Sequence, residues 1–130
     1  MSADTAILCV DDETGILVNL KEQLKRCFGN HYIYEVAQSA EEGWGVIDEL
    51  MSEDIKLLVI VSDWLMPGVK GDEFLAQVHQ KFPEIVMVML TGQADEKAIE
   101  RARRDANLYA CIQKPWAEEE LKQVISSALA

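Results

Sequence analysis

Strand-length runs of apolar residues recur along this chain, with longer amphipathic stretches between them. Four runs are mostly apolar, and the second of the five alternates between apolar and polar residues, as a strand near a sheet edge does. A strand that is apolar throughout is buried on both faces, which is typical of a parallel sheet covered by helices on both sides. The expected strands are residues 6–10, 32–37, 57–61, 85–90 and 108–113.

The stretches between these runs carry apolar residues at helical spacing. Ser39 with Glu42 three residues later is a capping box, which predicts where the second helix starts. Its apolar stripe is expected to hold Trp44, Ile47, Leu50 and Met51. The fourth helix is expected to bury only Ala94, Ala98, Ile99 and Ala102. Five strands alternating with five helices predict a doubly wound α/β fold, with residues 1–130 forming one domain.

Length and charge limit the classes of function. The chain has 130 residues, and 23 acidic against 12 basic residues give a net charge of −11. Such an acidic domain repels phosphate backbones, so we expect no direct nucleic-acid contact. No apolar run approaches membrane-spanning length and no secretion signal is present, which predicts no membrane partner and a cytoplasmic location. The three cysteines are too widely spaced for a disulfide framework or a zinc site.

Polar side chains follow four of the expected strands: Asp11 and Asp12, then Asp63, Thr91 and Lys114. Ligands of doubly wound sheets bind at the carboxyl ends of the strands, so we expect these side chains to converge. Neighbouring carboxylates repel one another, and Mg²⁺ relieves that repulsion. Asp63 follows the most central strand and is the expected nucleophile toward phosphorus, giving an acyl phosphate. Lys114 and Thr91 would stabilise the phosphoryl oxygens.

Each of these residues taken alone has an ordinary structural interpretation. Acidic pairs after a strand often cap the next helix, and an aspartate before Pro67 can begin a turn. Thr-Gly after a strand is usually a turn. Their occurrence at the same end of successive strands favours a shared chemical site.

Four segments together resemble response-regulator receiver domains of the CheY-like kind, the phosphoacceptor modules of two-component signalling. They span essentially the whole chain and read ILCVDDE, VSDWLMPGVKGDEFL, VMLTGQAD and LYACIQKPW. The resemblance implies a flavodoxin-like (βα)5 fold and phosphorylation of Asp63. It also implies Asp12 as a direct Mg²⁺ ligand, Asp11 as the holder of metal-bound water and the backbone carbonyl of Leu65 as a further ligand.

The same resemblance implies roles for the remaining site residues and for partners. Thr91 and Lys114 would contact the phosphoryl group, and the peptide bond before Pro115 would be cis. A histidine kinase or phosphotransfer protein would supply the phosphoryl group, and the domain would catalyse only its own phosphorylation and dephosphorylation. Apart from the resemblance, the helix with Arg101, Arg103 and Arg104, the last strand and the last helix form a face of mixed charge, which is either a contact for an output domain or a second copy, or an ordinary solvated surface. The segments NLY and KPW resemble receivers fused to phosphohydrolase or kinase outputs, and the 130 residues are either a whole protein or an N-terminal domain.

Three positions depart from the family pattern or flank its site. Cys111 stands where the family usually has an aromatic residue that moves with the threonine, which places that coupling in doubt. Tyr109 lies on the same side of the strand and either substitutes for that aromatic residue or is a packing residue, and packing is the favoured interpretation. Leu65 is expected to screen the phosphoryl group from water and prolong its lifetime. Gln93 either positions that water or faces solvent.

Other functions fit parts of the pattern. A metal-dependent phosphatase usually has a second aspartate two residues after the first, where this chain has Leu65. A degenerate receiver would bind partners without phosphorylation, but all five core positions are intact. A nucleotide-binding flavodoxin-like protein would have a glycine-rich phosphate loop after the first strand, which this sequence lacks.

Overall fold

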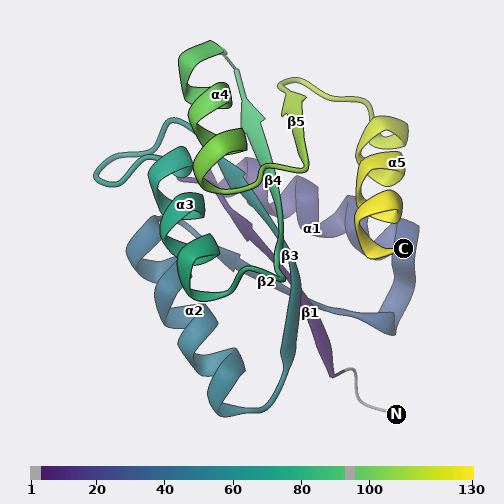
Figure 1. Ribbon diagram of the computed structural model, residues 1–130. Helices are drawn as coiled ribbons and strands as arrows, with labels where there is room; N and C mark the ends of the chain where they lie inside the picture. Colours follow the sequence, from purple (N-terminus) through teal and green to yellow (C-terminus); the bar gives the residue numbers. More distant parts are fainter. Residues whose placement is uncertain (1–3, 93–95) are drawn as a thin grey trace.

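A computed structural model describes residues 4–92 and 96–130, and its centre is one parallel sheet (Figure 1). The strand order is β2-β1-β3-β4-β5, and every neighbouring pair is parallel. The predicted α/β fold is therefore confirmed, with the alternating strand β2 at an edge and β3 in the centre. The strands are β1 (Thr5–Val10), β2 (Ile33–Ala37), β3 (Lys56–Asp63), β4 (Val86–Thr91) and β5 (Ala110–Gln113).

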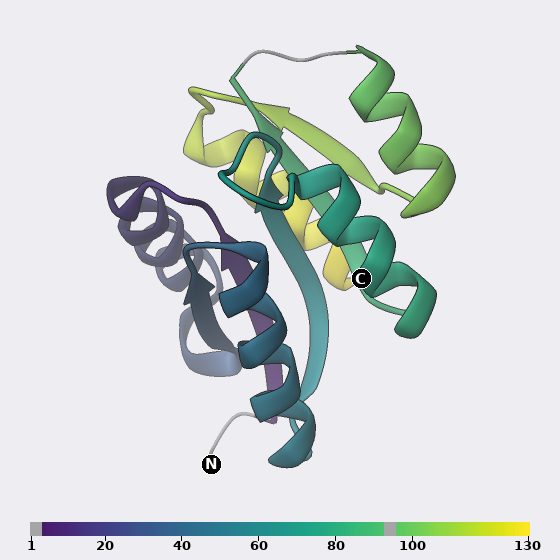
Figure 2. The same cartoon turned by 90° about the vertical axis from the view of Figure 1, so that its left-hand side faces the viewer.

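Helices cover both faces of this sheet. Figure 2 looks onto the layer formed by α2, α3 and α4, with α5 behind the sheet. A short 3₁₀ turn, Gly29–His31, leads from α1 to β2. The helices are α1 (Thr14–Phe28), α2 (Ala40–Ser52), α3 (Gly71–Lys81), α4 (Glu96–Asp105) and α5 (Glu118–Leu129). No helix in the described part of the chain is long and apolar enough to span a membrane.

The two helical layers explain why the central strands are apolar at every position. Successive side chains of a strand point to opposite faces, so each strand supplies both cores. In β1, Leu8 packs with the α2–α3–α4 side and Ile7 with the α1–α5 side. A single polar substitution on either face of such a strand would therefore place a polar group in a core.

The capping box of α2 is present. The Ser39 hydroxyl accepts a hydrogen bond from the backbone N–H of Glu42 at 3.1 Å. The Glu42 carboxylate in turn accepts one from the backbone N–H of Gln38 at 2.7 Å. This reciprocal pairing satisfies free N–H groups at the helix start and fixes where α2 begins.

Some predicted details differ from the structure. Met51 is 40% exposed, so the apolar stripe of α2 ends at Leu50. Residue 51 is the next to last of that helix. The last strand begins at Ala110 rather than residue 108, and Tyr109, interpreted as packing, is 50% exposed. In α4, Ala98 and Ala102 are buried as expected, whereas Ala94 lies outside the described residues.

Candidate functional site

The carboxyl ends of β1 and β3 bring three aspartates together. Asp11, Asp12 and Asp63 each offer a carboxylate oxygen, and these oxygens lie within 4.8 Å of one another. Asp11 and Asp63 are buried, whereas Asp12 is exposed. They border an open hollow of about 510 Å³. Its lining residues are Asp12, Glu13, Asp63, Trp64, Leu65, Gly92 and Lys114.

Lys114, at the end of β5, places a cation between two of these acids. Its Nζ lies 2.8 Å from Asp11 Oδ2 and 3.1 Å from Asp63 Oδ1. Its backbone N–H donates to the carbonyl oxygen of Thr91 at 2.8 Å, which joins the ends of β4 and β5. The following Lys114–Pro115 peptide bond is cis, as the family resemblance implies. The convergence expected from the sequence is therefore present in the fold.

Burial and like charges shift the protonation equilibria of this group. Burial raises the pKa of the Asp63 carboxyl from 3.8 to about 6, the Asp11 carboxylate adds to the rise, and Lys114 opposes it. Burial disfavours the charged form of Lys114, but its hydrogen bond to Asp11 and the charges of Asp63 and Asp11 outweigh this and raise its pKa. The ionised form of Asp63 is therefore disfavoured in the folded protein. A cation bound at the site would favour that form.

Asp11 is already engaged on both of its carboxylate oxygens. Oδ2 accepts from Lys114, and Oδ1 accepts from the backbone N–H of Glu13 at 2.9 Å. Asp12 and Asp63 carry the freer carboxylates. Oxygen donors of this kind suit a hard divalent cation such as Mg²⁺, which binds through one or two carboxylates and keeps water and phosphate oxygens as its other ligands. The residues present therefore fit a metal site.

Thr91 ends β4 beside the cluster. Its side chain is 2% exposed, and its hydroxyl has no hydrogen-bond partner within the described residues. A buried polar atom without a partner is uncommon and calls for a ligand or water. A phosphoryl oxygen at Asp63 is one such acceptor.

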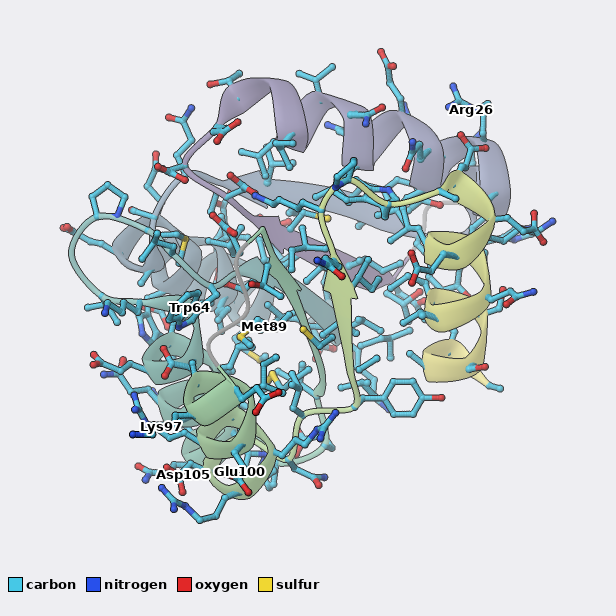
Figure 3. The ribbon with its side chains drawn as sticks, turned by 90° about the horizontal axis from the view of Figure 1, so that it is seen from above. Arg26, Trp64, Met89, Lys97, Glu100 and Asp105 are labelled. Atoms are coloured by element: carbon cyan, nitrogen blue, oxygen red, sulfur yellow. The ribbon has the colours of Figure 1, made fainter. Side chains whose placement is uncertain are left out.

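The loop after β3 is held against the site by a glycine that sequence reasoning missed. The Gly71 N–H donates to the Trp64 carbonyl at 2.7 Å, and a Cβ at residue 71 would collide with the backbone oxygen of Asp63. Figure 3 shows Trp64 on this loop, near the start of α3. The only signal in the sequence is a glycine at the start of a helix, which does not reveal the close approach.

The family departures have distinct structural settings. Cys111 is partly buried and packs on the α2–α3–α4 core, and burial raises the pKa of its thiol, so it is protonated at neutral pH. The Leu65 side chain is 58% exposed at the hollow. Gln93 lies outside the described residues, so neither interpretation of it is tested.

Comparisons with known proteins agree on one family. The family model described as "Response regulator receiver domain" matches residues 7–126. Among curated proteins, the chain is 31% identical over 123 residues to the hydrogenase transcriptional regulatory protein HoxA of Cupriavidus necator, covering 95% of this chain and 24% of HoxA. A chemotaxis protein CheY homologue of Campylobacter jejuni is 27% identical, with 95% of this chain and 91% of that protein covered. The chain thus spans about a quarter of the first relatives it matches.

Solved structures give the same result. A CheY-like receiver domain from Methanospirillum hungatei has a TM-score of 0.83 at 30% identity, covering 98% of this chain and 94% of that one. The receiver domain of an HD domain-containing protein from Pseudomonas fluorescens has a TM-score of 0.85 at 27% identity, with the same coverage.

Proposed function

Since the chain belongs to the response regulator receiver domain family, we propose that its Asp63 accepts a phosphoryl group from a histidine kinase or a phosphotransfer protein. One observation carries the assignment to Asp63. Its buried carboxylate lies 3.1 Å from the Lys114 ammonium, within an acidic cluster that borders an open hollow. Asp63 is the acid of that cluster that is both buried and open to the hollow, whereas Asp11 is closed off by its two hydrogen bonds.

In the proposed reaction a carboxylate oxygen of Asp63 forms a bond to phosphorus as the phosphorus–nitrogen bond of the donor histidine breaks. The imidazole leaves with the bonding electron pair. The Lys114 ammonium and the orphaned Thr91 hydroxyl bind the oxygens of the transferred group, where negative charge gathers. Hydrolysis of the acyl phosphate later restores Asp63. These steps modify the protein itself, as expected of a signalling domain.

Four groups would hold Mg²⁺: the Asp12 and Asp63 carboxylates, Asp11 through water, and the backbone carbonyl of Leu65. Bound there, the ion would neutralise charge on the phosphoryl oxygens. Asp12 is exposed and can receive the ion from solvent, whereas Asp11 is fixed by Lys114 and the Glu13 N–H. The chain's own contribution is to hold these oxygens together against their repulsion.

The location and the partners of the domain are proposed from its family and from the names of its relatives. We place residues 1–130 as a receiver domain in the cytoplasm, either alone or as the N-terminal part of a longer protein. The α4–β5–α5 face would contact an output domain or a second copy of the chain. HoxA is named a transcriptional regulatory protein, and a Brucella abortus relative is named a sensor kinase, so this kind of domain occurs with different outputs. No observation favours a phosphatase or a phosphorylation-independent module.

Incubation with acetyl phosphate and Mg²⁺ followed by intact mass measurement tests the proposal. We expect a phosphate-sized mass increment that requires Mg²⁺ and is lost in Asp63→Asn. Asp48→Asn, which changes an exposed aspartate on α2, is the matched control and should keep the increment. An increment that persists in Asp63→Asn would place the phosphoryl group elsewhere and contradict the proposal.

A further inference from the structure

Gln23 is a polar residue on the buried face of α1. It is 9% exposed and shares that face with the fully buried Leu20 and Leu24. Its Oε1 accepts a hydrogen bond of 2.7 Å from the indole Nε1–H of Trp116. A buried amide needs such a partner, and Trp116 is the partner that this structure gives it.

Trp116 belongs to the segment that carries Lys114 from β5 to α5. The backbone N–H of Lys114 is bonded to Thr91, but Pro115 has no N–H, and Ala117 provides no side-chain cap for α5. Two side-chain contacts join this segment and the start of α5 to α1. They are the Trp116–Gln23 bond and the Arg26–Glu118 ion pair, with an N–O distance of 2.6 Å. Figure 3 shows Arg26 reaching from α1 toward the start of α5.

Stability alone does not require a polar pair at Gln23 and Trp116. Two apolar side chains of similar shape in a buried contact are often as stable as a hydrogen-bonded pair. What a hydrogen bond adds is direction, because it weakens steeply when its angle departs from linear. The bond therefore fixes the orientation of Trp116, two residues from Lys114, more narrowly than packing would.

We propose that Gln23 is a positioning residue that acts through Trp116 to hold Lys114 between Asp11 and Asp63. Lys114 Nζ lies 2.8 Å from Asp11 Oδ2 and 3.1 Å from Asp63 Oδ1, and Trp116 follows only two residues later, so the orientation of Trp116 bears on where the Lys114 side chain starts. Gln23 itself does not line the hollow. The inference rests on the proposed phosphorylation of Asp63, in which Lys114 binds the transferred group.

The test is the initial rate of phosphorylation over a range of acetyl phosphate concentrations at saturating Mg²⁺. We expect Gln23→Leu to lower the maximal rate about tenfold with little change in the half-saturating concentration, because misplacement of a catalytic group acts on the transition state. Gln23→Glu keeps an acceptor oxygen and should stay within about twofold of the wild type. Trp116→Phe, which keeps the aromatic packing and removes the donor, should reproduce the Gln23→Leu loss.

Two controls separate positioning from stability. Arg26→Gln breaks the exposed ion pair at the same helix junction and should leave the maximal rate unchanged. The double variant Gln23→Leu with Trp116→Phe should be no slower than either single variant, because each single variant already removes the same hydrogen bond. The indole N–H resonance of Trp116 should move in Gln23→Leu and not in Arg26→Gln.

The outcomes distinguish this inference from the function on which it rests. If the wild type is phosphorylated and folded Gln23→Leu and Trp116→Phe both keep the wild-type maximal rate, the inference alone is overturned. A loss in Arg26→Gln as large as in Gln23→Leu would also overturn it. Absence of any Asp63-dependent mass increment in the wild type would overturn the proposed function and the inference with it. If circular dichroism shows that Gln23→Leu is unfolded, the maximal rate of Trp116→Phe relative to the wild type decides the question.

Discussion

Leu65 presents a large apolar side chain at the hollow beside Asp63, where 58% of its surface is exposed. Exposing so much apolar surface is unfavourable, because each Å² left in water forgoes about 25 cal/mol of the free energy that its burial would contribute. Its position favours exclusion of water from the phosphoryl group. We expect Leu65→Asn to speed autodephosphorylation several-fold, because an amide side chain can bind a water molecule there. Loss of the phosphate mass increment with time, after removal of acetyl phosphate, measures the rate.

Val69→Asn is the matched control for this change. Val69 is 37% exposed in the same loop and does not line the hollow, so its substitution should leave the rate unchanged. An unchanged or slower rate in Leu65→Asn would exclude the screening role. An equal acceleration in both variants would point to a general effect on the loop.

At the residue scale, the sequence was sufficient for side chains that directly follow strands. The convergence of Asp12, Asp63 and Lys114 was predictable because the carboxyl ends of parallel strands must meet at one sheet edge. Gly71 and Gln23 were missed, because their roles depend on how closely separate elements approach. A glycine at a helix start or a glutamine on a helix carries no local mark of that approach.

At the element scale, a buried ion pair joins α3 to α4. Asp72, in the first turn of α3, has a fully buried side chain, and Arg101 of α4 lies 2.9 Å from its Oδ2. Its Oδ1 has no hydrogen-bond partner within the described residues. The buried residues of α4 are the alanines Ala98 and Ala102. Small side chains bury little apolar area, so α4 depends on this pair for its attachment more than a leucine-rich helix would.

Arg101→Met should destabilise the protein by about 1–3 kcal/mol, because it leaves the Asp72 carboxylate buried without its cation. The estimate is at the low end for buried pairs, since 48% of the Arg101 side chain is exposed to water. Asp72→Asn should be less harmful, because it removes the buried charge itself. Urea unfolding at neutral pH gives the free energies of unfolding.

Arg104→Met supplies the comparison on the same helix. Arg104 pairs with Asp105 at an exposed site, so its loss should leave the free energy of unfolding nearly unchanged. Equal losses of stability in Arg101→Met and Arg104→Met would show that the buried Asp72–Arg101 pair stabilises the fold no more than an exposed ion pair does.

The elements were largely predictable, and their ends less so. The strands of the sheet interior stood out because burial on two faces leaves only apolar residues. The start of β5 was placed two residues early, because Leu108 and Tyr109 have strand-like side chains although they precede the ladder. Pairing with β4, which no local pattern encodes, decides where that strand begins.

At the scale of the whole molecule, the site and the stability of the fold are linked through Asp63. Burial raises the pKa of this carboxyl from 3.8 to about 6 in the folded protein. Between those values the folded state binds more protons than the unfolded state, so stability falls as the pH rises through this window. Above about pH 6 the folded protein carries the full penalty, and below about pH 3.8 both states are protonated and the penalty vanishes.

Asp63→Asn should therefore be more stable than the wild type at neutral pH in the absence of divalent cations, by roughly 1–3 kcal/mol. The difference should shrink as the pH falls from about 6 to about 4. Urea unfolding across this pH range measures it, with Asp48→Asn as an exposed control that should show no such pH dependence. A less stable Asp63→Asn protein at neutral pH would contradict the linkage.

The ion pair between Lys114 and Asp11 spans 103 residues of chain. During synthesis all three acids leave the ribosome long before the lysine that offsets their repulsion. A chain without its last strand therefore lacks the Lys114 ammonium that pairs with Asp11 and Asp63. The acidic cluster and its cation come together only once the fifth strand has joined the sheet, so the site depends on the whole sheet rather than on any one part of it.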